Sequence, residues 1–384
     1  MKKILVNFVT LGKTGIDIPR LLKFQELEKL GGEWHLFSGE FLKKMQLIGK
    51  DIYLFNKNFS ELEKLSDPGK TKIGFLFFAL KRNIRALRFL KEVKKGKYDF
   101  IYSPAAVLDL ILFPFVYKMF DRKVKWVVVL DNLVPFWDPG NKFIRFLAWF
   151  FYRISLFLIR KADCVFVISK DLQEYLLKKG FSREKIVLST NGVDNELIEK
   201  AKPDSRYNID ALFMGRINET KGIYDMLKAL DLVRRKYPHF QLAIMGEGDE
   251  VTEKQFKKKI KEMGLENNVE FLGFRSGIEK FNILKSAKCF WFLSVSESES
   301  FGVALLEAVV SGIPAFAYDL PQFRWLYPDG EVNILPKGDY EMVAKKVIKL
   351  FESGNFRNIK GEKLLGKYSW EKAAKVEYEA IKNL

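Results

Sequence analysis

The fold is indicated most clearly by one stretch of the sequence, Ser294-Val295-Ser296-Glu297-Ser298-Glu299-Ser300-Phe301-Gly302-Val303-Ala304-Leu305-Leu306-Glu307-Ala308. It follows the apolar run Cys289–Leu293, which predicts a buried strand, and its own apolar residues from Phe301 onward predict a helix. A strand that leads through a polar loop into a helix is typical of a parallel sheet covered by helices. Ligands bind at such strand-to-helix turns, and the free amides at the helix start suit a phosphate.

The same alternation of short apolar runs and longer helical patterns continues along the whole chain. Strands are predicted at 3–9, 33–38, 51–55, 98–103, 125–130, 164–169, 186–189, 209–214, 240–245, 269–272, 289–294, 313–318 and 331–335. Helices of ten or more residues are predicted at 74–95, 142–161, 222–236, 250–263 and 340–353, among others. This pattern predicts an α/β protein with two doubly wound parallel sheets.

Turn residues place the domain boundary near residue 200. Asn191-Gly192 and Pro203-Asp204-Ser205 are both turn signals, and a new strand begins at Ile209. We therefore expect an N-terminal domain at 1–200 and a C-terminal domain at 201–369. A last helix at 370–384 follows the candidate N-cap Ser369, and we expect it to pack back toward the first domain.

The composition fits two globular domains. A chain of 384 residues can bury two cores, and its 48% hydrophobic and 29% charged residues exclude a disordered chain. The two cysteines, Cys164 and Cys289, lie far apart in apolar runs and exclude a disulfide scaffold. The only two histidines, His35 and His239, exclude a multi-histidine metal site. We expect the cysteines to be core residues and the histidines to be structural or exposed.

The net charge of +17 is concentrated in the first half of the chain. Residues 1–200 carry 36 Lys and Arg against 22 Asp and Glu, whereas residues 201–384 carry 29 against 26. Such an excess suits an anionic partner, which can be a nucleic acid, a membrane surface or a small anionic substrate.

Two glutamates in the first quoted stretch are candidate sugar ligands. Glu299 lies just before the predicted helix and Glu307 about two turns into it, so one carboxylate is at the mouth of a groove and the other is deeper. Carboxylates in this arrangement suit the hydroxyls of a sugar. The alternative is a capping glutamate and an exposed helical glutamate without a ligand.

A second motif, Gly215-Arg216-Ile217-Asn218-Glu219-Thr220-Lys221-Gly222, places two cations in another strand-to-helix loop. Arg216 and Lys221 can neutralise a diphosphate there, Arg as a planar fork and Lys as a point charge. The alternative is a solvated basic loop. Gly246-Glu247-Gly248 is a further glycine turn after a strand, and Gly12-Lys13-Thr14-Gly15 is a first loop that lacks the earlier glycine of a P-loop.

Together these motifs resemble the family 4, or group 1, retaining glycosyltransferases, which have the GT-B fold: two Rossmann-like domains facing a cleft. Matching segments are the two motifs above, Gly246–Gly248, Val269–Gly273, Glu307–Pro314 and Asn191–Asp194. Their order and spacing agree over roughly residues 160–380, whereas the first domain fits in architecture alone.

The resemblance implies a role for each matching residue. Arg216 and Lys221 hold the donor diphosphate, Glu299 contacts the donor sugar, and Glu307 contacts the ribose. Further implied donor contacts are the amides of Ser300, Phe301, Gly302 and Val303, the turn glycines Gly215 and Gly246, the backbone near Phe274 at the base, and Gly12 and Gly15 near the transferred sugar.

The chain departs from the family pattern at one position. Leu130 stands where the family often carries a histidine, and Asp131 matches the aspartate that follows. Either Asp131 performs part of that work or the chemistry is altered. No Asp-x-Asp occurs in the chain, which favours chemistry without a metal and without a cofactor beyond the nucleotide-sugar substrate.

Two basic and aromatic segments predict contact with an anionic membrane. In 142–161, Lys142, Arg153 and Arg160 fall within about 20° of one line on an otherwise apolar helix. In 72–97, a cluster of phenylalanines precedes eight Lys and Arg. Such segments suit an anionic leaflet and a lipid-linked acceptor. The alternative for 142–161 is a helix buried between sheet and surface.

The expected function is therefore that of a retaining, hexosyltransferase-type glycosyltransferase of cell-surface polysaccharide or lipopolysaccharide synthesis. The apolar run after Met1-Lys2-Lys3 is too short for a signal peptide, so we expect a cytoplasmic protein, peripheral on the inner face of the plasma membrane. One alternative is a sugar-nucleotide epimerase or hydrolase on the same fold. Another is a non-catalytic sugar-nucleotide-binding protein; a nucleic-acid module has no need for Glu299 and Glu307 beside Arg216.

Overall fold

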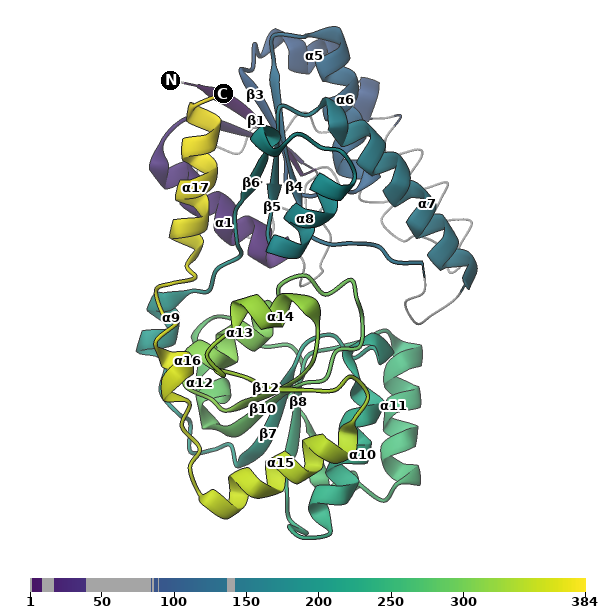
Figure 1. Cartoon of the computed structure of the whole chain (residues 1–384), viewed down its shortest axis with the longest axis vertical. Coiled ribbons are helices and arrows are strands. Elements are labelled where there is room, and N and C mark those ends of the chain that lie inside the picture. The colour runs from purple at the N-terminus through teal and green to yellow at the C-terminus, as the bar shows by residue number, and fades with distance from the viewer. Residues whose placement is uncertain (1, 9–16, 39–83, 85, 89, 137–141) are drawn as a thin grey trace. The chain divides into compact units, whose positions relative to one another are not determined.

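The computed structural model describes residues 2–8, 17–38, 84, 86–88, 90–136 and 142–384. The chain divides into two compact units, and each is built on a sheet whose six described strands are all parallel (Figure 1). The first unit comprises residues 1–191 and 370–384, and the second comprises residues 192–369. Helix α9 (Asn195–Lys200) therefore lies in the second unit, although the turn signals assigned residues up to 200 to the first domain.

The first unit has the strand order β2-β1-β3-β4-β5-β6. Its elements are β1 (Lys3–Phe8), α1 (Asp17–Leu30), β2 (Glu33–Ser38), α5 (Leu90–Lys95), β3 (Phe100–Ser103), α6 (Leu108–Phe120), β4 (Lys125–Leu130), α7 (Lys142–Leu158), β5 (Cys164–Val167), α8 (Lys170–Lys178), β6 (Ile186–Leu188) and α17 (Trp370–Lys382). The central strands β3 to β5 are almost wholly buried, which explains their continuous apolar runs. The predicted strand 51–55 and most of the predicted helix 74–95 lie outside the described residues.

The last helix, α17, packs on α1 and is fixed there by a buried ion pair. The carboxylate of Glu377, which is fully buried, lies 2.8 Å from Lys23 Nζ and accepts hydrogen bonds from Tyr102 Oη at 2.5 Å and Ser189 Oγ at 2.7 Å. Burial, and then the Glu377 carboxylate, raises the pKa of Tyr102. The phenol therefore stays neutral and donates a hydrogen bond to this carboxylate. A buried carboxylate with this many partners ties the C-terminal segment to the first unit.

The second unit has the strand order β12-β11-β10-β7-β8-β9. Besides α9, its elements are β7 (Ile209–Met214), α10 (Ile223–Arg234), β8 (Leu242–Met245), α11 (Glu250–Glu262), β9 (Val269–Phe271), α12 (Gly277–Ser286), β10 (Ala287–Phe292), α13 (Val303–Val310), β11 (Ala315–Tyr318), α14 (Pro321–Leu326), β12 (Asn333–Leu335), α15 (Tyr340–Ser353) and α16 (Ile359–Glu362). The chain runs outward from β7 through β8 to β9, then crosses to the other side of β7 and continues from β10 to β12. The topological switch point therefore lies between β7 and β10.

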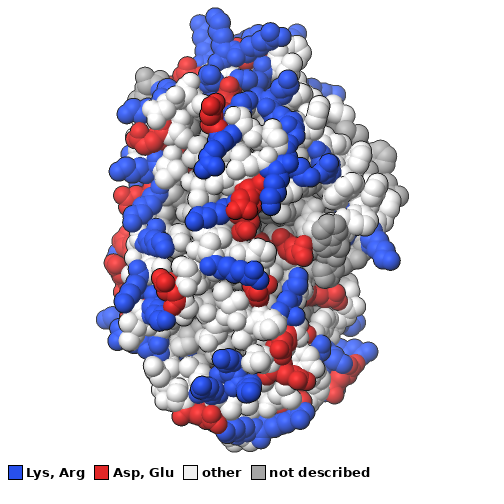
Figure 2. Space-filling model, in the orientation of Figure 1, with Lys and Arg blue, Asp and Glu red and all other residues white. Residues whose placement is uncertain are grey.

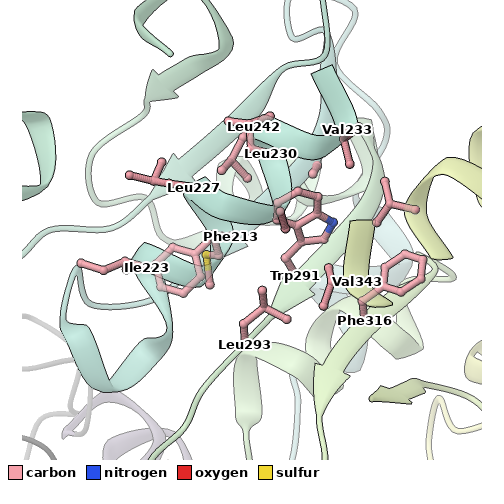
Figure 3. Close-up of a cluster of buried hydrophobic side chains, with 14 of the residues drawn as sticks. Phe213, Ile223, Leu227, Leu230, Val233, Leu242, Trp291, Leu293, Phe316 and Val343 are labelled. Atoms are coloured by element: carbon pink, nitrogen blue, oxygen red, sulfur yellow. The ribbon is translucent and has the colours of Figure 1, made fainter. Parts of the chain in front are cut away.

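The core of the second unit lies between the central strands and helices α10 and α15 (Figure 3). Trp291 of β10 is fully buried and stacks on Phe240 with ring centroids 6.0 Å apart. Leu227 and Leu230 of α10 project onto the same face of the sheet, as the 3.6-residue period of an amphipathic helix requires. The packed sheet is a rigid base for the loops at its edge.

Charge is distributed differently over the two units. Figure 2 shows Lys and Arg side chains gathered at the end of the first unit that carries α5, whereas both signs alternate over the second unit. Exposed basic residues at that end include Arg88, Lys91, Lys94, Lys95, Lys97, Arg122 and Lys123. No helix within the described residues combines the length and the apolar character that crossing a membrane requires.

Candidate functional site

The switch point of the second unit brings two predicted motifs together. The loop 215–222 leaves the carboxyl end of β7, and the loop 293–302 leaves the carboxyl end of the neighbouring strand β10. The chain leaves these two strands in opposite directions across the sheet. Open α/β sheets bind ligands at such a switch point, in the crevice outside the carboxyl ends of the strands.

Direct backbone contact joins these two loops. The amide of Val295 donates a hydrogen bond to the Thr220 carbonyl at 2.9 Å, and Ser294 Oγ donates to the same oxygen at 3.1 Å. Gly222 has φ +73°, and a Cβ there would stand 1.9 Å from the carbonyl oxygen of Leu293. Only glycine fits at that position, so the sequence of the first loop fixes its distance from the second.

The turn after β8 packs equally closely on the turn after β7. A Cβ on Gly246 would stand 1.9 Å from the carbonyl oxygen of Gly215, and the amide of Gly215 donates to the Met245 carbonyl at 3.0 Å. The amide of Ile217 donates to the Glu247 carbonyl, also at 3.0 Å. The glycines predicted to bind the donor thus have a structural task at this edge of the sheet.

The two cations of the first loop differ in what they contact. Within the described part of the chain, the exposed side chain of Arg216 makes no hydrogen bond or ion pair. Lys221 pairs with the Glu299 carboxylate across the crevice, and both of these side chains are largely buried. Gln322 Nε2 donates to the backbone carbonyl of Glu299 at 2.7 Å and so holds the loop that carries it.

Helix α13 points its first turn at the same crevice. Its N-cap, Gly302, adopts a left-handed conformation, and no side chain caps the helix. The backbone amides from Ser300 to Val303 directly follow Glu299, which pairs with Lys221. The Phe301 side chain is instead buried against Trp325 and Tyr368, so only the backbone of this predicted donor residue can reach a ligand.

The second glutamate, Glu307, lies within α13 and is nearly buried. Its Oε1 is 2.6 Å from Nζ of Lys280, which belongs to α12, the helix that connects the edge strand β9 with β10. Phe274, in the loop between β9 and α12, is 52% exposed. All predicted donor residues except Gly12 and Gly15, which lie outside the described residues, therefore lie at the carboxyl edge of one sheet.

Asp131 lies in the other unit, directly after β4. Its carboxylate pairs with the guanidinium of Arg20 from α1, and both side chains are mostly buried. Leu130 is buried in the sheet and offers no polar group. Tyr152 of α7 faces this region: burial, followed by the nearby Tyr175 and Asp131, raises the pKa of its phenol. The Asp131 site is thus an ion pair on the scaffold of the first unit.

The cysteines and histidines do not contribute to either site. Burial raises the pKa of the Cys164 thiol to about 12 and also raises that of Cys289, so neither forms a nucleophilic thiolate near neutral pH. His35 is held between Tyr98 and Glu33, and His239 is exposed. No group of three or more His, Cys, Asp or Glu among the described residues is arranged to hold a metal ion.

Three contacts at these sites were missed by sequence reasoning: Lys280 on Glu307, Gln322 on the Glu299 backbone, and Arg20 on Asp131. Lys280 could have been found, because it follows a strand at the same sheet edge as Arg216 and Lys221. The other two have no local signal, since they depend on how helices α14 and α1 pack.

Comparison with known families identifies the chain. Residues 26–197 match the model described as "Glycosyltransferase Family 4", and residues 194–363 match the model described as "Glycosyl transferases group 1". The chain belongs to the group 1 glycosyltransferases of family 4, enzymes that transfer sugars, and its fold is GT-B.

Three similar proteins illustrate this family. The chain is 31% identical to phosphatidyl-myo-inositol mannosyltransferase of Mycobacterium leprae over 192 residues, which cover 48% of this chain and 50% of that protein. It is 25% identical over 278 residues to the lipopolysaccharide core biosynthesis glycosyltransferase LpsE of Rhizobium meliloti, covering 69% and 78% of the two chains. The structure of HepE from Anabaena with UDP and glucose matches over 100% of both chains at 17% identity, with a TM-score of 0.75, and so shares the fold.

Proposed function

We propose that this protein is a retaining glycosyltransferase that moves a sugar from a nucleoside-diphosphate donor to a hydroxyl of a lipid-linked or polysaccharide acceptor. The observation that carries the proposal is the meeting of two loops at the switch point: Arg216 and Lys221 come from one, and Glu299 and the start of α13 come from the other. Positive groups and helix amides together suit a diphosphate, and carboxylates suit sugar hydroxyls.

The proposed chemistry needs positive charge where the diphosphate leaves. When the anomeric C–O bond breaks, its electron pair goes to the phosphate oxygen and the sugar becomes oxocarbenium-like. Among the described residues Arg216 has no partner to give up when a diphosphate binds. Lys221 is already held in place by Glu299, as stabilisation of a developing charge requires. We assign the sugar to Glu299, the ribose to Glu307 and the base to the backbone near Phe274.

Retention of anomeric configuration follows if the acceptor hydroxyl attacks on the face from which the diphosphate leaves. The acceptor proton then passes to the leaving phosphate oxygen, so no protein base is required, and Arg216 and Lys221 take the part that a metal ion plays in other transferases. Asp131, paired with Arg20, is assigned to the acceptor side.

The membrane part of the proposal rests on one face of α7. Phe143, Phe146, Phe150 and Phe157 are 57%, 46%, 45% and 71% exposed, and their spacing places them on the same side of the helix. Exposed Lys142 and Arg153 lie beside this face, and α7 contains no acidic residue. Aromatic side chains flanked by cations suit an anionic leaflet. The exposure of these rings disfavours the alternative of a helix buried on every side.

A lipid-linked acceptor agrees with this surface and with the named activities of the mannosyltransferase and lipopolysaccharide relatives. We propose that the protein works as a peripheral protein on the inner face of the plasma membrane. The described part of the segment 72–97, the second predicted membrane contact, carries the exposed cations Arg88, Lys91 and Lys94.

The decisive experiment measures the consumption of UDP-, GDP- and ADP-sugars with and without bacterial membranes, which supply lipid-linked acceptors. NMR then determines the anomeric configuration of the product. The proposal predicts diphosphate release that requires membranes and a product with the donor's anomeric configuration. Release of free sugar without membranes supports a hydrolase, a new sugar nucleotide supports an epimerase, and an inverted product contradicts retention.

The membrane surface has its own test. Sedimentation with vesicles of phosphatidylglycerol and phosphatidylcholine should fall several-fold in Phe146→Ser/Phe150→Ser, because the change removes two exposed rings that the bilayer would bury. Ile359→Ser, at an equally exposed apolar residue of the second unit, is the matched control and should bind as the wild type does. Equal binding by both variants contradicts the assignment of α7.

A further inference from the structure

The ion pair between Lys280 and Glu307 has no part in the proposed chemistry. Lys280 Nζ lies 2.6 Å from Glu307 Oε1, and the two side chains are 21% and 11% exposed. The residues come from different helices, α12 and α13, that follow different strands. The pair therefore forms only when both strand-to-helix units are in place.

Glu307 is unusual for its position in α13. Its neighbours Leu306 and Ala308 are fully buried, and a carboxylate among them needs a partner to remain charged. Lys280 supplies that partner and is itself held in place, since Nζ lies over the Phe281 ring at 4.2 Å from its centroid. Oε1 takes the lysine's hydrogen bond, which leaves Oε2 as the oxygen available to a ligand.

Glu299, the glutamate just before α13, is also held by a lysine. Lys221, after β7, pairs with Glu299, as Lys280, after β9, pairs with Glu307. Each carboxylate thus stands in an anion-binding site without adding net negative charge to it. An unpaired carboxylate there would repel a diphosphate. Because each carboxylate is paired with a lysine, the site can bind hydroxyls through its carboxylates and a diphosphate through its cations.

We propose that Lys280 is a positioning residue of the nucleotide subsite. It fixes the Glu307 carboxylate so that Oε2 accepts a hydrogen bond from one hydroxyl of the donor ribose, and it cancels the carboxylate's charge. Lys280 thereby sets the preference of the site for a ribonucleotide over the deoxy form that lacks this hydroxyl. The inference rests on the proposed function, in which Glu307 meets the ribose.

Calorimetric titration tests this role. UDP, GDP and ADP are titrated into the wild type first, followed by the 2′-deoxy and 3′-deoxy forms of the nucleotide that binds. One deoxy form should bind about tenfold more weakly than the parent, because a hydrogen bond to a charged group is lost. In Lys280→Met that ratio should fall to about one, and the parent nucleotide should bind about tenfold more weakly.

Three further variants separate positioning from a structural role. Lys280→Arg should retain most of the ratio, since it keeps the charge and the donor. Lys280→Met/Glu307→Gln should bind the parent nucleotide no more weakly than Glu307→Gln alone, because the lysine acts through the carboxylate. Lys254→Met, at an exposed lysine of α11, is the control and should leave all affinities unchanged.

The outcomes distinguish this inference from the proposed function. If no diphosphate binds the wild type, or if binding survives Arg216→Ala, the proposed donor site is wrong and the role of Lys280 is wrong with it. If binding needs Arg216 but Lys280→Met changes neither the affinity for the parent nucleotide nor the deoxy ratio, the lysine is only structural. An equal loss for parent and deoxy forms in Lys280→Met makes it a general cation and also overturns the inference.

Discussion

The two units share one architecture and differ at the carboxyl edges of their sheets. In the second unit this edge carries Arg216 and two lysine–glutamate pairs, supported by loops in backbone contact. In the first unit the described part of the edge offers Asp131 in a pair with Arg20, and α7 presents exposed phenylalanines. The difference teaches that the doubly wound sheet is a common scaffold and that the loops determine which ligand each unit can receive.

The loops at the carboxyl edge of the second unit are packed closely on one another. Gly222 and Gly246 allow three loops of the second unit to touch backbone to backbone. A site for charge that develops in a transition state has to be pre-oriented, and such loops provide this.

Arg216→Ala should lower turnover about 10²–10³-fold, because the leaving diphosphate loses a charged hydrogen-bond donor of the protein. Arg216→Lys should recover part of this loss, since it restores the charge without the planar fork. Steady-state release of nucleoside diphosphate measures both variants. A loss of less than fivefold in Arg216→Ala would remove this residue from the proposed chemistry.

Gly222→Ala should destabilise the second unit far more than Gly264→Ala does. Both residues have positive φ, but the new Cβ meets the Leu293 carbonyl at 1.9 Å in the first case and has nothing within 4 Å in the second. We expect a loss in the free energy of unfolding of about 1 kcal/mol for Gly264→Ala, from backbone strain, and about 2–4 kcal/mol for Gly222→Ala. Urea denaturation measures both, and equal losses would show that the loops tolerate separation.

Asp131→Asn should lower turnover about tenfold and leave the affinity for nucleoside diphosphate unchanged, because Asp131 belongs to the first unit. The change also removes the charge that pairs with Arg20, so the stability of the variant has to be measured alongside. Turnover and calorimetry on the same preparation give both values. A matching fall in nucleotide affinity would contradict the division of tasks between the units.

Tyr102→Phe tests the hydrogen bond that Tyr102 donates to Glu377, the carboxylate whose ion pair with Lys23 fixes α17 to the first unit. Burial raises the pKa of Tyr102 in the folded state, so above pH 10 the unfolded chain loses this proton while the folded chain keeps it. The contribution of Tyr102 to stability is thus complete below pH 10 and falls as the pH rises further. Relative to pH 8, the wild type should lose about 0.8 kcal/mol more than Tyr102→Phe at pH 10.5. Equal losses in urea denaturation would show that this phenol is not protected.

Much of the fold could be predicted from the sequence, because strands buried on both faces read as continuous apolar runs. The runs 125–130 and 209–214 coincide with β4 and β7, and 289–294 starts and ends two residues later than β10. The charged loops of the second unit could be predicted for the same reason, since Arg216, Lys221 and Glu299 directly follow such strands. The family models that match the chain confirm the fold and the family.

Contacts between distant elements could not be predicted. The position of Lys280 after a strand places it near this sheet edge, but its pairing with Glu307 depends on the rotation of two helices, which the sequence does not give. The burial of the Phe301 ring depends in the same way on Trp325 and Tyr368. The division at residue 191 was missed because α9 follows strong turn residues yet belongs to the second unit.

The central claim is that the second unit alone holds the donor nucleotide. The most direct measurement is calorimetric titration of UDP, GDP and ADP into the wild type, Arg216→Ala and Asp131→Asn. The account predicts that one nucleotide binds the wild type, binds Asp131→Asn with the same affinity, and binds Arg216→Ala at least tenfold more weakly. Unchanged affinity in Arg216→Ala, or an equal loss in both variants, would contradict it.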